Sequence, residues 1–160
     1  TIRPAAESDV DMIFNALAGI AETVGERHKL TSSPEDLRRY GFGDRPAFGC
    51  LIAEIEQRFA GCCLYFPSFS TWMGKPGAYV QDFYVAEEFR GQGVGEGLLQ
   101  RLASMTRAQG GSYIRLAVDK KNHRAQAFYR RCGILHSDTE QIHMARDEDF
   151  DRLADADPLG

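Results

Sequence analysis

Glycines alternate with other residues at Gly91, Gly93 and Gly95, between an apolar run and a segment with helical spacing of apolar side chains. A helix that begins near Val94 directs its unpaired backbone N–H groups and the positive end of its dipole at this turn. Because glycine lacks a Cβ atom, a diphosphate can approach the backbone closely. Arg90 places a cation immediately before the turn. These residue types in this order predict a diphosphate-binding turn.

Two other phosphate-binding patterns are excluded by position. A dinucleotide fingerprint requires the order G-x-G-x-x-G. Counted from Gly91 its last position holds Glu96, and counted from Gly93 it holds Leu98. A P-loop requires Gly-Lys followed by Ser or Thr, which the segment lacks. A turn that only links a strand to a helix is the remaining alternative, and the adjacent arginine and the amphipathic helix weigh against it.

The overall composition describes one ordinary globular domain. The chain has 160 residues, a net charge of -4 and no basic cluster, which argues against nucleic acid as a partner. No apolar run approaches the ~18 residues of a membrane span, and the first residues show no signal-peptide pattern. Four cysteines without C-x-x-C spacing indicate free thiols and a cytoplasmic location. The four histidines show no H-x-x-x-H pattern, so no metal is expected.

Apolar periodicity and turn-forming residues divide the chain into strands and helices. The expected strands cover residues 2–5, 48–55, 59–66, 78–85, 113–118 and 141–145. The expected helices cover residues 9–24, 34–41, 94–109 and 123–131, and Trp72, Gly74 and Pro76 predict a loop over 68–77. The order β-α-α-β-β-β-α-β-α-β predicts an α+β fold, a mixed sheet with packed helices, in one domain over residues 1–146. Residues 147–160 form an acidic tail, expected as a helical turn or disordered.

Several runs carry a family resemblance. The run Arg90-x-x-Gly93-x-Gly95 resembles the acetyl-CoA motif of the GNAT (Gcn5-related) N-acetyltransferases. Asn122 and the run Ala127-Phe128-Tyr129-Arg130-Arg131-x-Gly133 resemble a later motif of that superfamily, and residues 2–5 resemble its first strand. Within the superfamily the chain is most similar to the diamine (spermidine/spermine) N1-acetyltransferases. That similarity rests on the runs GFGD-x-P at 41–46, CLIAE at 50–54, WMGK at 72–75 and DFYV at 82–85.

The resemblance implies acetyl-CoA as the acetyl donor, a small-molecule amine as the acceptor, and a homodimer. It also implies a mostly antiparallel sheet that splays beside the strand before the glycine turn, where the pantetheine arm would pair with backbone groups. The implied acetyl-CoA contacts are Phe83, Tyr84, Val85, Arg90, Gly91, Gln92, Gly93, Val94, Gly95, Glu96, Asn122, Arg124, Ala125 and Arg130. Asn122 is equally suited to cap the following helix, and the two later arginines are equally suited to face solvent.

The resemblance assigns Tyr129 as the general acid. A phenol with an ordinary pKa of about 10 is protonated at neutral pH and can protonate a leaving thiolate. The alternative is an aromatic side chain that packs under the sheet and has no chemical role.

The candidate base departs from the family pattern. Diamine acetyltransferases carry Glu-Asp before this strand end, whereas this chain has Gln81-Asp82. Gln81 cannot accept a proton. Neighbours on a regular strand face opposite ways, so Asp82 need not replace the missing glutamate. A chain of waters, Glu22 and Glu26 are the alternative bases.

The candidate amine contacts are Glu26, Trp72, Gln81 and Asp82. The residues before Trp72 lack the acidic side chain of the family, and the run Arg27-His28-Lys29 makes a nearby loop basic. Both departures favour a short amine with its own carboxylate, such as a diamino acid or lysine analogue, over a long polycation. The alternatives are a non-catalytic acyl-CoA-binding sensor and a protein or peptide N-acetyltransferase. A peptide would need an open groove, which the loop at 68–77 is expected to cover.

Overall fold

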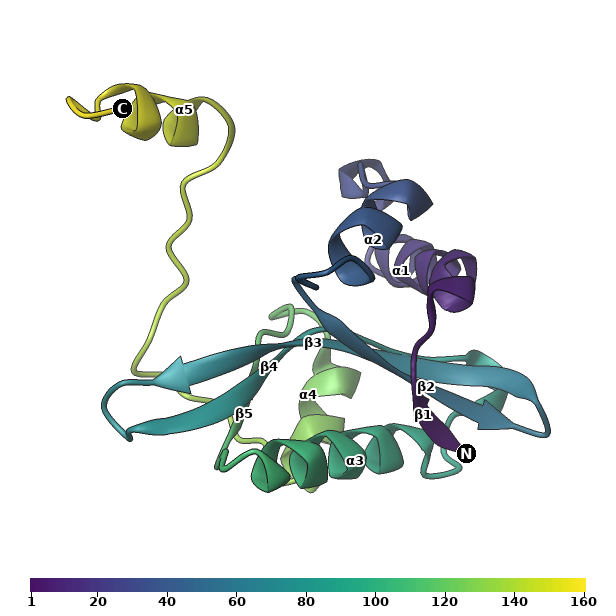
Figure 1. The fold of residues 1–160 in the computed structure, drawn as a ribbon. Helices are drawn as coiled ribbons and strands as arrows, with labels where there is room; N and C mark the ends of the chain where they lie inside the picture. Colours follow the sequence, from purple (N-terminus) through teal and green to yellow (C-terminus); the bar gives the residue numbers. More distant parts are fainter.

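The computed structural model describes residues 1–160, and its centre is a five-stranded sheet with the order β1-β2-β3-β4-β5 (Figure 1). The strands are β1 (Ile2–Pro4), β2 (Gly49–Ile55), β3 (Arg58–Ser70), β4 (Lys75–Val85) and β5 (Ile114–Leu116). Neighbouring strands are antiparallel except β4 and β5, which are parallel. The predicted α+β fold with a mixed, mostly antiparallel sheet is confirmed.

Helices cover both faces of the sheet. α1 (Val10–Thr23) and α2 (Pro34–Gly41) lie on one face, and α3 (Val94–Ala108) and α4 (His123–Arg131) lie on the other (Figure 1). Short 3₁₀ turns occur at Glu7–Asp9, Arg27–Lys29 and Glu87–Phe89. The helix bounds closely match the predicted ones. None of the helices is long and apolar enough to cross a membrane.

Alternation along the central strands divides the core in two. Leu51 and Cys63 face α3, whereas Ile52 and Cys62 face α1 and α2. All four side chains are fully buried, and burying an aliphatic side chain of this size contributes about 1.5–3 kcal/mol. The adjacent cysteines therefore point to opposite faces, as predicted, and all cysteines of the chain are free thiols.

The segment 68–77, expected as a loop, is the end of a long hairpin. β3 continues to Ser70 and β4 begins at Lys75, and the two ends pair with each other. Gly74 supplies the left-handed backbone of the turn, with φ +64°. Gly77 lies within β4, and glycine is needed there because an added Cβ atom would overlap the ring of Tyr113. The glycines that predicted a loop thus serve a tight turn and a close contact within a hairpin.

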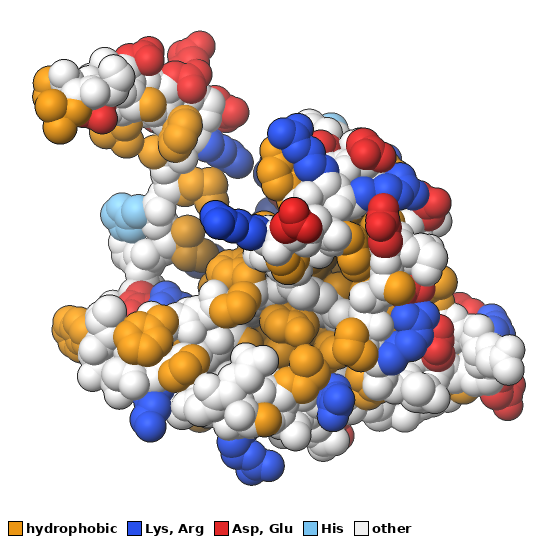
Figure 2. Space-filling model, viewed as in Figure 1, with side chains coloured by type: hydrophobic (Ala, Val, Ile, Leu, Met, Phe, Trp, Pro, Cys, Tyr) orange, Lys and Arg blue, Asp and Glu red, His pale blue; other side chains and the backbone are white.

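No strand forms at residues 141–145, so that prediction is wrong. A strand needs a hydrogen-bonded neighbour, and every residue from Leu135 to Gly160 is exposed. The acidic tail forms a regular helix, α5 (Asp147–Asp155), which an extended segment holds away from the sheet (Figure 1, Figure 2). The expected strand at 113–118 is also shorter, because β5 pairs over three residues only.

Candidate active site

A cleft of about 690 Å³ opens between the C-terminal end of β4, the start of α3 and the start of α4. The last turn of α1 closes its other side through Ile20, Thr23 and Val24. Its lining mixes apolar side chains with a few cations and backbone polar groups, as small-molecule sites do. The predicted acetyl-CoA contacts that line it are Phe83, Tyr84, Val85, Arg90, Gly91, Gly93, Val94, Gly95, Glu96, Asn122, Arg124 and Ala125.

Two predicted contacts lie outside this lining. The Gln92 amide instead donates a hydrogen bond to the Glu88 carbonyl oxygen at 2.9 Å, and Arg130 faces solvent. Arg131, one residue further along α4, lines the cleft. The α1 wall was missed because helical spacing marks its apolar residues only as core. The polar residue Thr23 on that face is the one sequence signal that could have indicated a cleft.

β4 parts from β5 beside the cleft. The two strands pair only over Ala78–Val80 and Ile114–Leu116, whereas β4 runs on to Val85. From Gln81 onward, the edge of β4 that faces away from β3 therefore has backbone groups without a strand partner. An extended ligand with amide groups can pair with such an edge as an added strand does. This matches the splay that the family resemblance implies for the pantetheine arm.

The glycine turn needs glycine for two different reasons. Gly91 and Gly93 have left-handed backbone, with φ +73° and +80°, which costs any other residue about 1–2 kcal/mol. Gly95 allows a close approach, because an added Cβ would lie 2.9 Å from the Phe128 ring. No side chain caps α3, so the first N–H groups of that helix are free to bind an anion.

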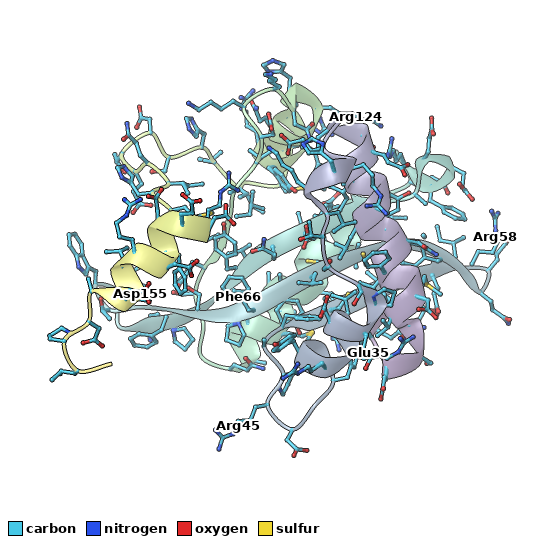
Figure 3. The ribbon with its side chains drawn as sticks, turned by 90° about the horizontal axis from the view of Figure 1, so that it is seen from above. Glu35, Arg45, Arg58, Phe66, Arg124 and Asp155 are labelled. Atoms are coloured by element: carbon cyan, nitrogen blue, oxygen red, sulfur yellow. The ribbon has the colours of Figure 1, made fainter.

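Three cations line the same cleft as the free N–H groups. Arg90, Arg124 and Arg131 all line the cleft, and Figure 3 shows Arg124 at the start of α4 beside the end of α1. The Arg90 side chain also donates from Nε to the Val85 carbonyl oxygen at 3.0 Å, which braces the end of β4. Asn122 caps α4, because its Oδ1 accepts a hydrogen bond from Ala125 N at 3.1 Å. Its amide N–H groups remain available to a ligand.

Tyr129 lies in an aromatic cluster on the α4 side of the sheet. Its ring is 6.1 Å from that of Phe83 and 5.4 Å from that of Phe128, between centroids, and both of those rings line the main cleft. Burial, and then the nearby Cys63 and Cys132 thiols, raise the pKa of Tyr129 to about 12. No enclosed side-chain oxygen of the chain lacks a hydrogen-bond partner. The unpartnered phenol oxygen therefore still reaches accessible space.

The structure corrects the prediction that Gln81 and Asp82 face opposite ways. β3 pairs Leu64 with Asp82 but its next residue with Val80, so Gln81 is an extra residue that forms a β-bulge. Val80 faces α3 and Tyr84 faces α1. Alternation on either side of the bulge then places both Gln81 and Asp82 on the α1 face. Asp82 thus lies on the same face as Gln81, which stands at the position of the family's glutamate.

Asp82 is a half-buried carboxylate that makes neither a hydrogen bond nor an ion pair. Burial raises its pKa, which makes its ionised form a stronger base. Asp82 pairs across the strands with Leu64, and the next residue of β4, Phe83, packs its ring against that of Tyr129. A proton acceptor and a proton donor therefore lie on opposite faces of the sheet, beside the splay.

One predicted amine contact, Trp72, is not brought to this place. Trp72 is 99% exposed in the hairpin turn, and the strand from Lys75 to Asp82 spans roughly 23 Å. The hairpin therefore does not roof the cleft, and the predicted obstacle to a peptide is absent. Glu26 lies after α1 and pairs with Lys29 at 2.7 Å. No group of three or more His, Cys, Asp or Glu side chains is placed to hold a metal ion.

Comparison with known proteins identifies the family. The family model described as Acetyltransferase (GNAT) family matches residues 14–134, which include the glycine turn, β4 and α4. The chain belongs to the acetyltransferase (GNAT) family. This GNAT enzyme is similar to the thialysine N-epsilon-acetyltransferase of Bos taurus, with 36% identity over 140 residues that cover 82% of each chain.

Two further proteins resemble this GNAT enzyme more distantly. The spermidine/spermine N(1)-acetyltransferase-like protein 1 of Homo sapiens is 29% identical over 147 residues, which cover 88% of this chain and 21% of that protein. The crystal structure of an aminoglycoside acetyltransferase from an uncultured soil metagenomic sample, in complex with sisomicin, superposes with a TM-score of 0.73 at 18% identity. The superposition covers 92% of this chain and 95% of that chain, and it shows a shared fold.

Replacing Gly93 by Ala is expected to weaken acetyl-CoA binding about tenfold, because the strained turn moves the first N–H groups of α3 away from the diphosphate. Gly74→Ala is the matched control, since its φ of +64° is also left-handed and its added Cβ also meets no neighbour. Both variants should lose similar thermal stability, and only Gly93→Ala should raise the Kd in calorimetric titration. Equal Kd values for both variants and the wild type would show that the turn does not hold the donor.

Proposed function

We propose that this GNAT enzyme is an acetyl-CoA-dependent N-acetyltransferase that acts by direct attack on the primary amine of a small molecule, with lysine analogues as the preferred acceptors. The observation that carries the proposal is the unpaired Asp82 carboxylate on one face of the sheet, next along β4 to Phe83, whose ring packs against that of Tyr129 on the other face. The 36% identity to enzymes named for thialysine supports the acceptor class.

The cleft suits acetyl-CoA, which when bound supplies an activated acetyl thioester. The free N–H groups at the start of α3, with Arg124 beside them, would hold the diphosphate, and the unpaired edge of β4 would hold the pantetheine arm. A backbone N–H near Tyr84 or Val85 would polarise the acetyl oxygen. Asp82 takes the proton of the acceptor amine as the C–N bond forms. Tyr129 gives its proton to the sulfur as the C–S bond breaks.

The charges on the α1 side of the sheet favour a short acceptor over a polyamine. Asp82 is the one carboxylate of the bulge, and Glu26 is already neutralised by Lys29. Arg27 and His28 leave the turn after α1 basic. An acceptor with one reacting amine and its own carboxylate complements this arrangement, whereas a polycation leaves ammonium groups unpaired. We further propose a homodimer, as the family resemblance implies, and a cytoplasmic location, which is in keeping with the free thiols.

Thiol release from acetyl-CoA, measured with a panel of amines, tests the acceptor class. The panel contains thialysine, lysine, spermidine, an aminoglycoside and a peptide with a free N-terminus. We expect kcat/KM for thialysine to exceed that for spermidine by about tenfold or more, because one unpaired ammonium is worth about 1.4 kcal/mol or more. A higher value for spermidine or for the peptide would overturn the assignment of lysine analogues.

A further inference from the structure

A second cavity lies beside the cleft, where α1 packs on β3 and β4 (Figure 1). Its volume is about 370 Å³, and we call it the side pocket. The residues that line it are Met12, Asn15, Ala16, Phe59, Tyr84 and Ala86. No charged side chain is among them, and the short side chain of Ala16 leaves room between the helix and the sheet. The side pocket therefore suits an apolar, uncharged group.

Tyr84 is the only residue that lines both the side pocket and the cleft. Its ring stacks on that of Phe59, with a centroid distance of 6.3 Å and an interplanar angle of 13°. It also lies against α1 at Gly19, where an added Cβ atom would be 3.3 Å from Tyr84 Cε2. The Tyr84 ring is thus held between β3 and α1, and it forms the wall between the two cavities.

The proposed reaction brings the acyl group of the donor to this wall. A backbone N–H near Tyr84 or Val85 holds the thioester oxygen, so the acyl group lies at the level of Tyr84 on β4. On the α4 side of the sheet, the stacked rings of Phe83 and Phe128 close the space, with a centroid distance of 5.7 Å. On the α1 side, the Tyr84 ring stands between the cleft and the side pocket. An acyl chain longer than acetyl therefore meets Tyr84.

We propose that the Tyr84 ring limits the acyl donor to acetyl-CoA, and that the side pocket behind it fits the apolar chain of a longer donor such as butyryl-CoA. This inference rests on the proposed function, because it concerns the donor of the same reaction. The bond changes are those of acetyl transfer. The C–S bond of the thioester breaks, the C–N bond forms, Asp82 accepts the proton of the amine, and Tyr129 protonates the sulfur.

Removing the wall tests the proposal. Calorimetric titration without an acceptor gives the Kd of acetyl-, butyryl- and succinyl-CoA, and thiol release with thialysine gives kcat/KM for each donor. The wild type should favour acetyl-CoA over butyryl-CoA by about tenfold or more. Tyr84→Ala should lower that preference about tenfold, because butyryl-CoA binds more tightly. It should bring no gain for succinyl-CoA, since no cation in the side pocket pairs with the succinyl carboxylate. Tyr84→Phe keeps the ring and should keep the wild-type preference.

Two further substitutions act on the side pocket from outside the cleft. Ala16→Leu, added to Tyr84→Ala, should restore the preference for acetyl-CoA, because the larger side chain fills the side pocket from α1. Ala16→Leu alone should leave the preference unchanged, since the wall is still in place. Phe59→Ala removes the stacking partner of Tyr84 and alters no residue of the cleft. It should lower the preference in part, which keeps the test available if Tyr84→Ala does not fold. Circular dichroism verifies the fold of each variant.

Other outcomes overturn the inference. An unchanged preference in folded Tyr84→Ala and Phe59→Ala, with acetyl-CoA still bound, would place a longer acyl chain elsewhere. A gain for succinyl-CoA equal to that for butyryl-CoA would indicate a general loosening of the cleft and no apolar pocket for the chain. A wild type that binds acetyl-CoA but transfers its acetyl group to no amine would instead refute the proposed function. The titrations without an acceptor keep these two failures apart.

Discussion

Replacing Tyr129 by Phe is expected to lower kcat about 10²–10⁴-fold, because the departing sulfur loses its proton donor. The ring stays, so its contacts with Phe83 and Phe128 are kept. The phenol has no hydrogen-bond partner to lose, so the thermal midpoint should be almost unchanged. Acetyl-CoA affinity, measured by titration without an acceptor, should also be unchanged, since the main cleft does not include this side chain.

Tyr113→Phe is the matched control for the loss of a phenol oxygen. Its hydroxyl is 2.8 Å from that of Ser68, near the far end of the hairpin. Removing it costs about 0.5–1.5 kcal/mol of stability for one hydrogen bond and should leave kcat unchanged. An unchanged kcat for Tyr129→Phe would mean that water protonates the departing thiolate and that Tyr129 takes no part in the reaction.

Replacing Asp82 by Asn is expected to lower kcat/KM about 10²–10⁴-fold, the contribution of a positioned base. The pH dependence separates this role from a structural one. Burial raises the pKa of Asp82, and only the ionised form accepts a proton, so activity is lost as the pH falls through that raised value. In the wild type, the plot of log kcat/KM against pH has a slope of about one above that pH, because the amine must be neutral. Below that pH the slope should rise to about two. The variant should keep a slope of about one.

Stability gives an independent readout for Asp82. A carboxyl whose pKa is raised by folding stabilises the fold below its unfolded pKa and loses that contribution as the pH rises through the folded value. At neutral pH the ionised Asp82 therefore destabilises the folded state, and Asp82→Asn should match or exceed the wild-type thermal midpoint. Gln81→Asn, a change to the neighbouring residue of the bulge, is the control that should leave the pH profile unchanged. An unchanged profile in Asp82→Asn would assign the proton to another acceptor.

The lining of the cleft at the glycine turn was predictable because its residues are local. The left-handed glycines, the free N–H groups and Arg90 all occur within one strand–turn–helix segment, whose order determines what they can bind. The N-cap role of Asn122 was equally readable, since it depends on a residue three positions later. The α1 wall was not, because Thr23 reaches the cleft only through the packing of a helix far away in the chain.

The arrangement of the acceptor half could not be predicted, because it depends on how β4 pairs with β3. Strand alternation predicted that Gln81 and Asp82 face opposite ways, and one unpaired residue opposite β3 reverses that conclusion. A bulge depends on the partner strand, so the local pattern of residues 78–85 does not contain it. The same limit applies to residues 141–145, whose alternation is that of a strand but which pair with no other strand.

The most direct test of the proposed reaction is transfer of a labelled acetyl group. The enzyme is incubated with acetyl-CoA carrying ¹³C in the acetyl group and with an excess of thialysine, and the acceptor is analysed by mass spectrometry. The account predicts labelled acetyl on the side-chain amine in many equivalents per enzyme, with an equal amount of free thiol. Tight acetyl-CoA binding without labelled product from any amine of the panel would contradict it, and would indicate an acyl-CoA-binding sensor with the same fold.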